Sequence, residues 1–152
     1  MPARNVRGPD EPPSPVEERG EHLGIKFSRG RTHTSNSHLS LEAAEFAYEY
    51  GDDWAFHRRM FKAYFEDLEN IGNLDTVVRI GAEAGLNAAS LRAALEDGRY
   101  RERVDEGLTW SRGIGVTAIP TFVFNGRYGM VGAQEIEAFR TMMAKVGQPP
   151  KS

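Results

Sequence analysis

A proline placed directly before a β-prone run constrains the fold of this 152-residue chain more than any other feature. Pro120 precedes the run Thr121–Phe124, and the dipeptide Asn125-Gly126 follows it. Proline is tolerated at the first residue or at the edge of a strand, and cis X-Pro bonds are kept for particular local geometries. Asn-Gly favours a hairpin because both residues tolerate positive φ. The pattern predicts a proline loop at Ile119 that opens a β-hairpin.

Helical periodicity accounts for most of the chain before this hairpin. The spacing of apolar and capping residues predicts five helices that form a block over residues 36–112. We expect these helices at residues 36–51, 52–72, 73–85, 87–98 and 100–112. After the hairpin, an amphipathic pattern that includes Ile136 and Phe139 predicts a last helix, ended by Pro149-Pro150.

Two packing expectations follow from this pattern. The second helix of the block is expected to bury one aromatic stripe, formed by Trp54, Phe61, Tyr64, Phe65 and Leu68. Such a stripe is most simply the packing seam of the helices, although it could also line a small-molecule pocket. In the fifth helix, Trp110 is expected to face inward.

The first 35 residues are less regular. Residues 1–15 are rich in proline and predict an irregular leader. Residues 16–35 predict a short helix, an extended piece at Ile25–Phe27 and a basic, hydroxyl-rich loop. Residues 113–148 then contain the proline loop, the hairpin and the last helix. The predicted fold class is therefore an α-rich α/β protein.

Composition excludes several function classes. Hydrophobic residues make up 39% of the chain and charged residues 27%, as in one soluble globular domain. A net charge of -3 without a basic cluster argues against nucleic-acid binding. No apolar run approaches the ~20 residues that span a bilayer. The first residues lack the apolar centre of a secretory signal, so we expect a cytoplasmic protein.

Three segments resemble the DsbA-like branch of the thioredoxin fold, including its FrnE-like members. They are Phe56–Gly72 (FHRRMFKAYFEDLENIG), Leu74–Leu86 (LDTVVRIGAEAGL) and Gly113–Gln134 (GIGVTAIPTFVFNGRYGMVGAQ). The resemblance implies a thioredoxin fold with an inserted helical domain, ending in a cis-proline strand, its hairpin partner and a helix. Nothing before Val16 resembles the strand, helix and strand that open this fold, so we expect a truncated member.

The resemblance also implies a chemistry that this chain lacks. In the family, a cysteine at a helix N-terminus is held as the reactive thiolate. The chain contains no cysteine. Thiol–disulfide exchange requires an attacking thiolate. We therefore expect a relative of thiol–disulfide oxidoreductases and isomerases that is redox-inactive by itself, with no catalytic residue assigned. Whether it is an enzyme stays open.

The resemblance assigns a substrate-binding role to Ile119 and Pro120. In the family, the backbone beside the cis-proline pairs with an extended peptide or thiol substrate, a form of β-augmentation. The simpler alternative is that Pro120 merely begins an edge strand in the trans form.

A second class of function is a glutathione-linked isomerase or transferase. Chromene-carboxylate isomerases and kappa-class glutathione transferases share this layout and hold glutathione near the start of the last helix. Gly132, Ala133 and Gln134 are weak candidates there, since backbone N–H groups at a helix N-terminus bind anions. An ordinary helix cap explains the same residues, so glutathione is a minor expectation and no other cofactor is expected.

A third class is a non-catalytic binding or assembly module. Without the opening strands of the fold, the edge at Thr121–Phe124 is left unpaired, which is a known liability. We expect a partner chain, the leader or a second copy in a homodimer to cover this edge. No metal site is expected, because His33 and His38 flank a loop-like stretch without supporting carboxylates.

Overall fold

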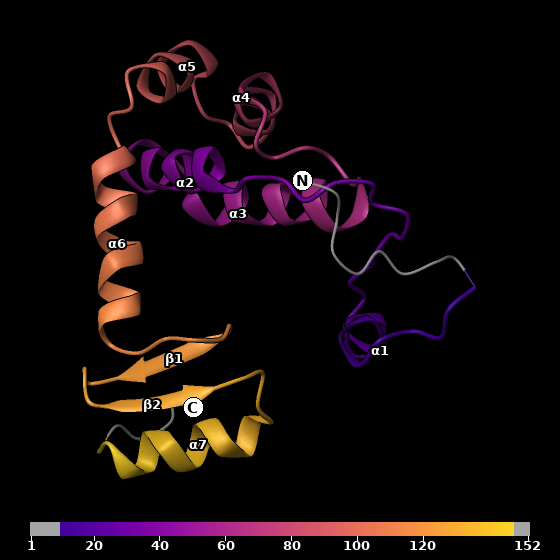
Figure 1. Ribbon diagram of the computed structural model, residues 1–152, viewed down its shortest axis with the longest axis vertical. Coiled ribbons are helices and arrows are strands. Elements are labelled where there is room, and N and C mark those ends of the chain that lie inside the picture. Colours follow the sequence, from indigo (N-terminus) through magenta and orange to yellow (C-terminus); the bar gives the residue numbers. More distant parts are fainter. Residues whose placement is uncertain (1–9, 148–152) are drawn as a thin grey trace. The chain divides into compact units, whose positions relative to one another are not determined.

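The structure is a computed structural model that describes residues 10–147. Its elements are α1 (Pro15–His22), α2 (His38–Tyr50), α3 (Asp53–Phe61), the π-helix η1 (Lys62–Glu66), α4 (Leu74–Glu83), α5 (Ala88–Glu96), α6 (Arg101–Gly113), β1 (Thr121–Phe124), β2 (Tyr128–Val131) and α7 (Ile136–Lys145), drawn in Figure 1. Most of the predicted leader and the predicted stop at Pro149-Pro150 lie outside the described residues. The predicted fold class, with a block of helices before a hairpin and a last helix, is confirmed.

The chain divides into two compact units. The helical unit comprises residues 1–106 and the hairpin unit residues 107–152, so the division falls inside α6. The boundary expected from the sequence, between residues 112 and 113, lies at the end of that helix. The two units are described separately below.

Side-chain caps fix where the helices of the helical unit begin. The capping residues and the backbone N–H groups they accept from are Asp52 with Ala55, Asn73 with Thr76 and Asn87 with Ser90. Each cap satisfies one of the N–H groups that a helix start leaves without an intrahelical partner. These three predicted helix starts are confirmed.

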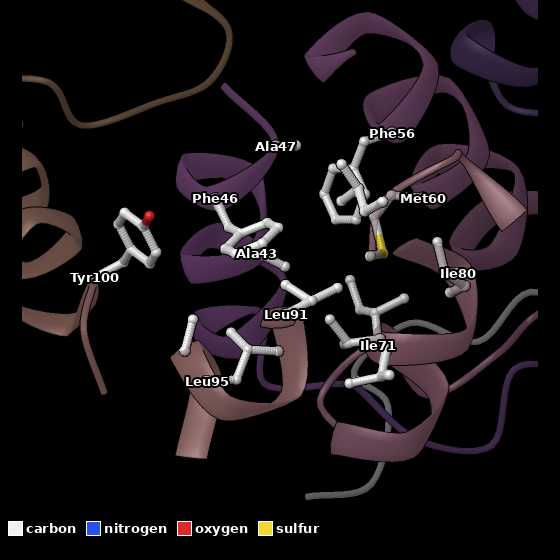
Figure 2. Packing of buried hydrophobic residues seen from close by; sticks show 14 of the residues in the cluster. Ala43, Phe46, Ala47, Phe56, Met60, Ile71, Ile80, Leu91, Leu95 and Tyr100 are labelled. Atoms are coloured by element: carbon white, nitrogen blue, oxygen red, sulfur yellow. The ribbon is translucent and has the colours of Figure 1, made fainter. Parts of the chain in front are cut away.

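The hydrophobic core lies among α2, α3, α4 and α5, whose side chains converge in Figure 2. Its largest fully buried apolar side chains are Phe56, Ile80, Leu91 and Val77. At Gly81 a Cβ atom would meet Leu91 Cδ2 at 2.3 Å, so any other residue there would force the buried Leu91 side chain to shift. No residue described between 107 and 147 is buried to this degree.

The expected aromatic stripe is wrong for the first helix after Asp52. Trp54 is 69% exposed and Phe61 60% exposed, whereas Phe56, Met60 and Ala63 on another face are buried. Both sets have helical spacing, so periodicity could not choose between them, and the larger aromatic residues favoured the wrong face. The expected helix over 52–72 also ends earlier, because α3 passes into η1 and Leu68 has φ 57°. Trp110 is 60% exposed rather than inward-facing.

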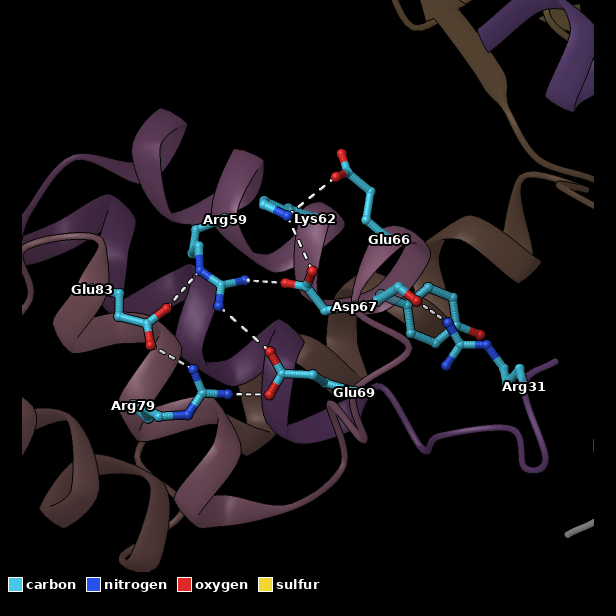
Figure 3. A network of polar contacts seen from close by, with 9 residues as sticks. Arg31, Arg59, Lys62, Glu66, Asp67, Glu69, Arg79 and Glu83 are labelled. Carbon is cyan, nitrogen blue, oxygen red and sulfur yellow. Dashed lines mark hydrogen bonds and ion pairs between the residues drawn. The ribbon is translucent and has the colours of Figure 1, made fainter. Parts of the chain in front are cut away.

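A network of charged side chains joins α3 and η1 to α4 (Figure 3). Arg59 lies at its centre and donates to Glu83 at 2.6 Å, to Asp67 at 3.3 Å and to Glu69 at 3.4 Å. The remaining cations are Arg79, which bonds Glu69 and Glu83, and Lys62, which bonds Glu66 and Asp67. This acid–base network covers the π-helical turn that replaces the predicted regular helix.

Candidate functional site

The proline loop of the hairpin unit is held by two hydrogen bonds. The Ile119–Pro120 peptide bond is cis. The Gly132 N–H donates to the Pro120 carbonyl at 2.8 Å, and Thr121 Oγ1 donates to the Ala118 carbonyl at 2.6 Å. The Ile119 side chain is 90% exposed. The loop therefore presents a large apolar side chain to solvent from a fixed backbone.

The hairpin turns where the sequence predicts. Asn125 has φ 51° and Gly126 φ 63°, and the Arg127 N–H donates to the Phe124 carbonyl at 3.0 Å. Positive φ at consecutive residues is the property for which Asn-Gly is favoured in hairpin turns. The predicted turn is confirmed.

The register of the hairpin decides which backbone groups face outward. Phe122 pairs with Met130 in the antiparallel ladder. The Gly132–Pro120 hydrogen bond continues this register, and hydrogen-bonded pairs alternate with non-hydrogen-bonded ones along such a ladder. The N–H and C=O groups of Thr121 and Val123 therefore point away from β2. In the described part of the chain the sheet has two strands only, so this edge of β1 is unpaired.

The same register gives the sheet one covered and one open face. Phe122 points toward α7, where its ring meets that of Phe139 with centroids 4.8 Å apart in a T-shaped arrangement. Residues of the opposite parity lie on the other face. There Val123 is 40% exposed and Val131 is 55% exposed. An open apolar face thus adjoins the unpaired edge.

The glutathione candidates do not lie at a helix start. Gly132, Ala133 and Gln134 belong to the connection between β2 and α7, which begins only at Ile136. The Gly132 N–H is already used by the Pro120 carbonyl, and the N-cap position of α7 is Glu135. A carboxylate at this position disfavours a second anion. The three residues therefore lead into α7 rather than form its first turn, and a role for them in binding glutathione stays a prediction.

The chain offers no thiol nucleophile, and the described residues contain no metal centre. The chain has no cysteine. Within residues 10–147, no three histidine, aspartate or glutamate side chains are grouped so as to hold a metal ion. Over the same range, no helix combines the length and apolar character needed to cross a membrane.

One polar cluster was missed by sequence reasoning. His38 Nδ1 lies 2.9 Å from Glu42 Oε1, and His38 Nε2 lies 3.0 Å from Asp105 Oδ1. These hydrogen bonds, that to Asp105 foremost, raise the pKa of His38 above its ordinary value. The His38–Glu42 spacing of one helical turn was a visible signal. Asp105 was not, since it comes from α6.

Three comparisons place this geometry among known proteins. A family model described as a DSBA-like thioredoxin domain matches residues 14–144. An uncharacterized protein of Bacillus subtilis (strain 168), YwbO, is 31% identical over 111 residues, which is 71% of this chain. A probable DsbA oxidoreductase of Streptomyces coelicolor has the same fold, with a TM-score of 0.79 over 90% of this chain at 24% identity.

A helical block followed by a hairpin and a helix is an α-rich thioredoxin-like fold. The chain belongs to the DsbA-like thioredoxin family, which is related to thiol–disulfide oxidoreductases. It spans 55% of the length of the Bacillus protein and 60% of the Streptomyces chain.

Proposed function

We propose that this chain binds an extended polypeptide segment along the outer edge of β1, at Ile119, Thr121 and Val123, and exchanges no disulfides by itself. The observation that carries the proposal is the unpaired, uncharged edge beside a 90% exposed Ile119. Extended peptides add to such edges through main-chain hydrogen bonds, and side-chain pockets set their specificity.

The composition of the edge supports strand addition. Natural proteins protect exposed edges with charged side chains, bulges or proline at hydrogen-bonding positions. The four residues of β1 carry no charge. Pro120, whose carbonyl accepts from Gly132, faces β2, so its missing N–H costs the outer edge no donor.

The open face of the hairpin indicates which side chains the bound peptide should carry. Side chains of an added strand on this side would lie next to Val123, with Val131 one strand further in. Both are apolar and about half exposed. A segment with β-branched or aromatic residues at alternate positions would bury this surface, and a segment with charges there would not.

A titration with a short β-prone peptide tests the proposal. The probe is acetyl-Lys-Val-Thr-Val-Thr-Val-Lys-amide, added to the full chain while backbone amide shifts and amide exchange are followed by NMR. Binding should shift the amides of Ile119, Thr121 and Val123 and slow the exchange of the last two. Shifts at Gly129 and Val131 instead would place binding on β2 and contradict the assignment.

Two matched proline variants separate the edges. Val123→Pro removes an outward N–H of β1 and should weaken binding roughly fivefold or more, since one hydrogen bond contributes about 1 kcal/mol. Val131→Pro removes an outward N–H of β2 together with a side chain of the open face, and should weaken binding less than Val123→Pro does. If Val123→Pro disturbs the hairpin, Ile119→Asp provides the test instead. The Ile119 side chain is exposed, so this substitution should weaken peptide binding without disturbing the fold.

The occupant of the edge is a second outcome of the same experiment. Protected Thr121 and Val123 amides without peptide, together with a dimer in light scattering, would mean that a second copy covers the edge. A monomer that binds no peptide would overturn the proposal.

The absence of thiol exchange is tested separately. The chain should not accelerate the reduction of insulin disulfides by dithiothreitol, because it supplies no attacking thiolate. Acceleration would show a redox role that this proposal excludes. A cytoplasmic location remains a prediction, tested by fractionation of cells that express the tagged chain.

A further inference from the structure

Polar side chains on one stripe of α2 join it to the start of α6. The stripe consists of His38, Glu42, Glu45 and Glu49, spaced so that they share one helical face. Its links are Tyr100 Oη to Glu49 at 2.9 Å, Arg103 to Glu45 at 2.8 Å, Arg101 to Glu42 at 3.9 Å and His38 to Asp105 at 3.0 Å. All of these residues belong to the helical unit.

His38 differs from the other members because both of its ring nitrogens face carboxylates. A neutral imidazole has one N–H donor, and only the protonated ring has two. The distances of 2.9 Å to Glu42 and 3.0 Å to Asp105 therefore fit an imidazolium that donates to both. His38 in this form connects the first turn of α2 with the second turn of α6.

The buried side chain of Glu42 makes the positive charge of His38 important for stability. Its side chain is 1% exposed, and its Oε2 has no hydrogen-bond partner among the described residues. Burial of an ionised carboxylate is unfavourable unless positive groups or donors compensate it. The positive groups that face it are His38 from its own helix and Arg101 from α6. Loss of the His38 charge leaves Arg101, at 3.9 Å, as the remaining cation.

We propose that His38 is a pH-sensitive latch that holds the start of α6 on α2 while its imidazole is protonated. The groups facing it are Glu42 on α2 and Asp105 on α6, and the like-charged Arg101 approaches the same Glu42 oxygen from α6. The other links persist at alkaline pH. Burial, aided by the hydrogen bond to Glu49, raises the pKa of Tyr100 to about 12.

The direction of the response follows from linkage. Because Asp105 and Glu42 raise the His38 pKa above 6.5 in the folded chain, the latch contributes its full stability below pH 6.5. That contribution disappears as the pH rises through the raised folded pKa. Val104 and Tyr100 are buried, so we expect release to loosen the first turns of α6 rather than to unfold the helix.

Histidine NMR and amide exchange of the full chain test the latch between pH 5.5 and 9. The His38 Cε1–H signal should titrate with a midpoint above 6.5. The amides of residues 104–106, corrected for the intrinsic pH dependence of exchange, should lose protection above that midpoint. In the His38→Gln variant, the same amides should have, at every pH, the low protection that they have in the wild type at pH 9.

Two further variants distinguish the latch from general packing. Asp105→Asn removes a carboxylate that is 61% exposed, so the fold should persist while the His38 midpoint falls. Glu45→Gln weakens the neighbouring link to Arg103 and should leave the pH dependence intact. A wild-type midpoint at or below 6.5, or the same pH-dependent loss of protection in His38→Gln, would overturn the proposal.

Discussion

The helical unit and the hairpin unit both have well-formed secondary structure, yet among the described residues only the helical unit has a core. In the helical unit, apolar side chains such as Phe56, Leu91 and Ile80 are fully buried. In the hairpin unit, the largest apolar side chains of the sheet are all partly exposed, and a hairpin of two strands is marginal in water by itself. The difference shows that regular backbone pairing and burial are separate requirements, and that the hairpin unit meets only one of them.

Truncation of a core aromatic should show this contrast most strongly. Phe56→Ala removes a fully buried ring and should lower the free energy of unfolding by about 3–5 kcal/mol. Phe139→Ala in the hairpin unit removes one partner of the Phe122 pair and should cost roughly 1 kcal/mol. Urea unfolding followed by circular dichroism, with amide exchange reporting each unit, measures both. Equal losses would show that the hairpin unit has a core after all.

Two helical glycines should respond in opposite directions. Gly81→Ala places a Cβ atom against Leu91 and should destabilise the helical unit by about 1–3 kcal/mol. Gly107→Ala meets no atom within 4 Å and should stabilise α6 by up to about 1 kcal/mol through helix propensity. Thermal unfolding of the two variants gives the comparison. Stabilisation by Gly81→Ala would mean that α4 and α5 can separate without loss.

The acid–base network should contribute least, and its contribution should depend on salt. Arg59→Met should cost about 1 kcal/mol at low ionic strength and less in 1 M NaCl, where the Debye length is about 3 Å. In the hairpin unit, the exposed Arg140–Glu137 pair offers a matched control, and Arg140→Met should change nothing measurable. A loss independent of salt would assign the role of Arg59 to packing rather than charge.

The same network predicts sensitivity to acid. Hydrogen bonds from Lys62 and Arg79 lower the pKa values of Asp67 and Glu83, respectively. Groups with lowered pKa values stabilise the folded state above their unfolded pKa and lose that contribution as the pH falls through the folded value. The urea concentration at the unfolding midpoint of the wild type should therefore decrease as the pH is lowered below about 4, and that of Arg59→Met should decrease less. If the urea midpoints of the two proteins depended on pH in the same way, the charge of Arg59 would have no part in the acid sensitivity.

Local chemistry made several elements predictable. Asp52, Asn73 and Asn87 start helices because their side chains replace missing intrahelical acceptors, and Asn125-Gly126 turns because both residues adopt positive φ. These properties reside in a few adjacent residues, so the sequence suffices to locate them. The three family-like segments likewise located the fold class.

Packing choices were not predictable in this way. Trp54 and Phe61 are spaced as regularly as Phe56 and Met60, and only the neighbouring helices decided which pair is buried. The π-helical turn after Phe61 was missed in the same way. The link between His38 and Asp105 joins residues far apart in the chain, and no local pattern encodes such a distance.

The sequence by itself determined the order of the elements, their caps, the hairpin turn and the lack of a thiol. The tertiary structure decided which helix faces are buried, that Glu42 is enclosed beside His38, and that Val123 lies on an open face next to an unpaired edge. The physical reason is how far apart in the chain the interacting residues lie. Capping and turn formation act between neighbouring residues, whereas burial and strand pairing depend on contacts that form only when distant segments meet.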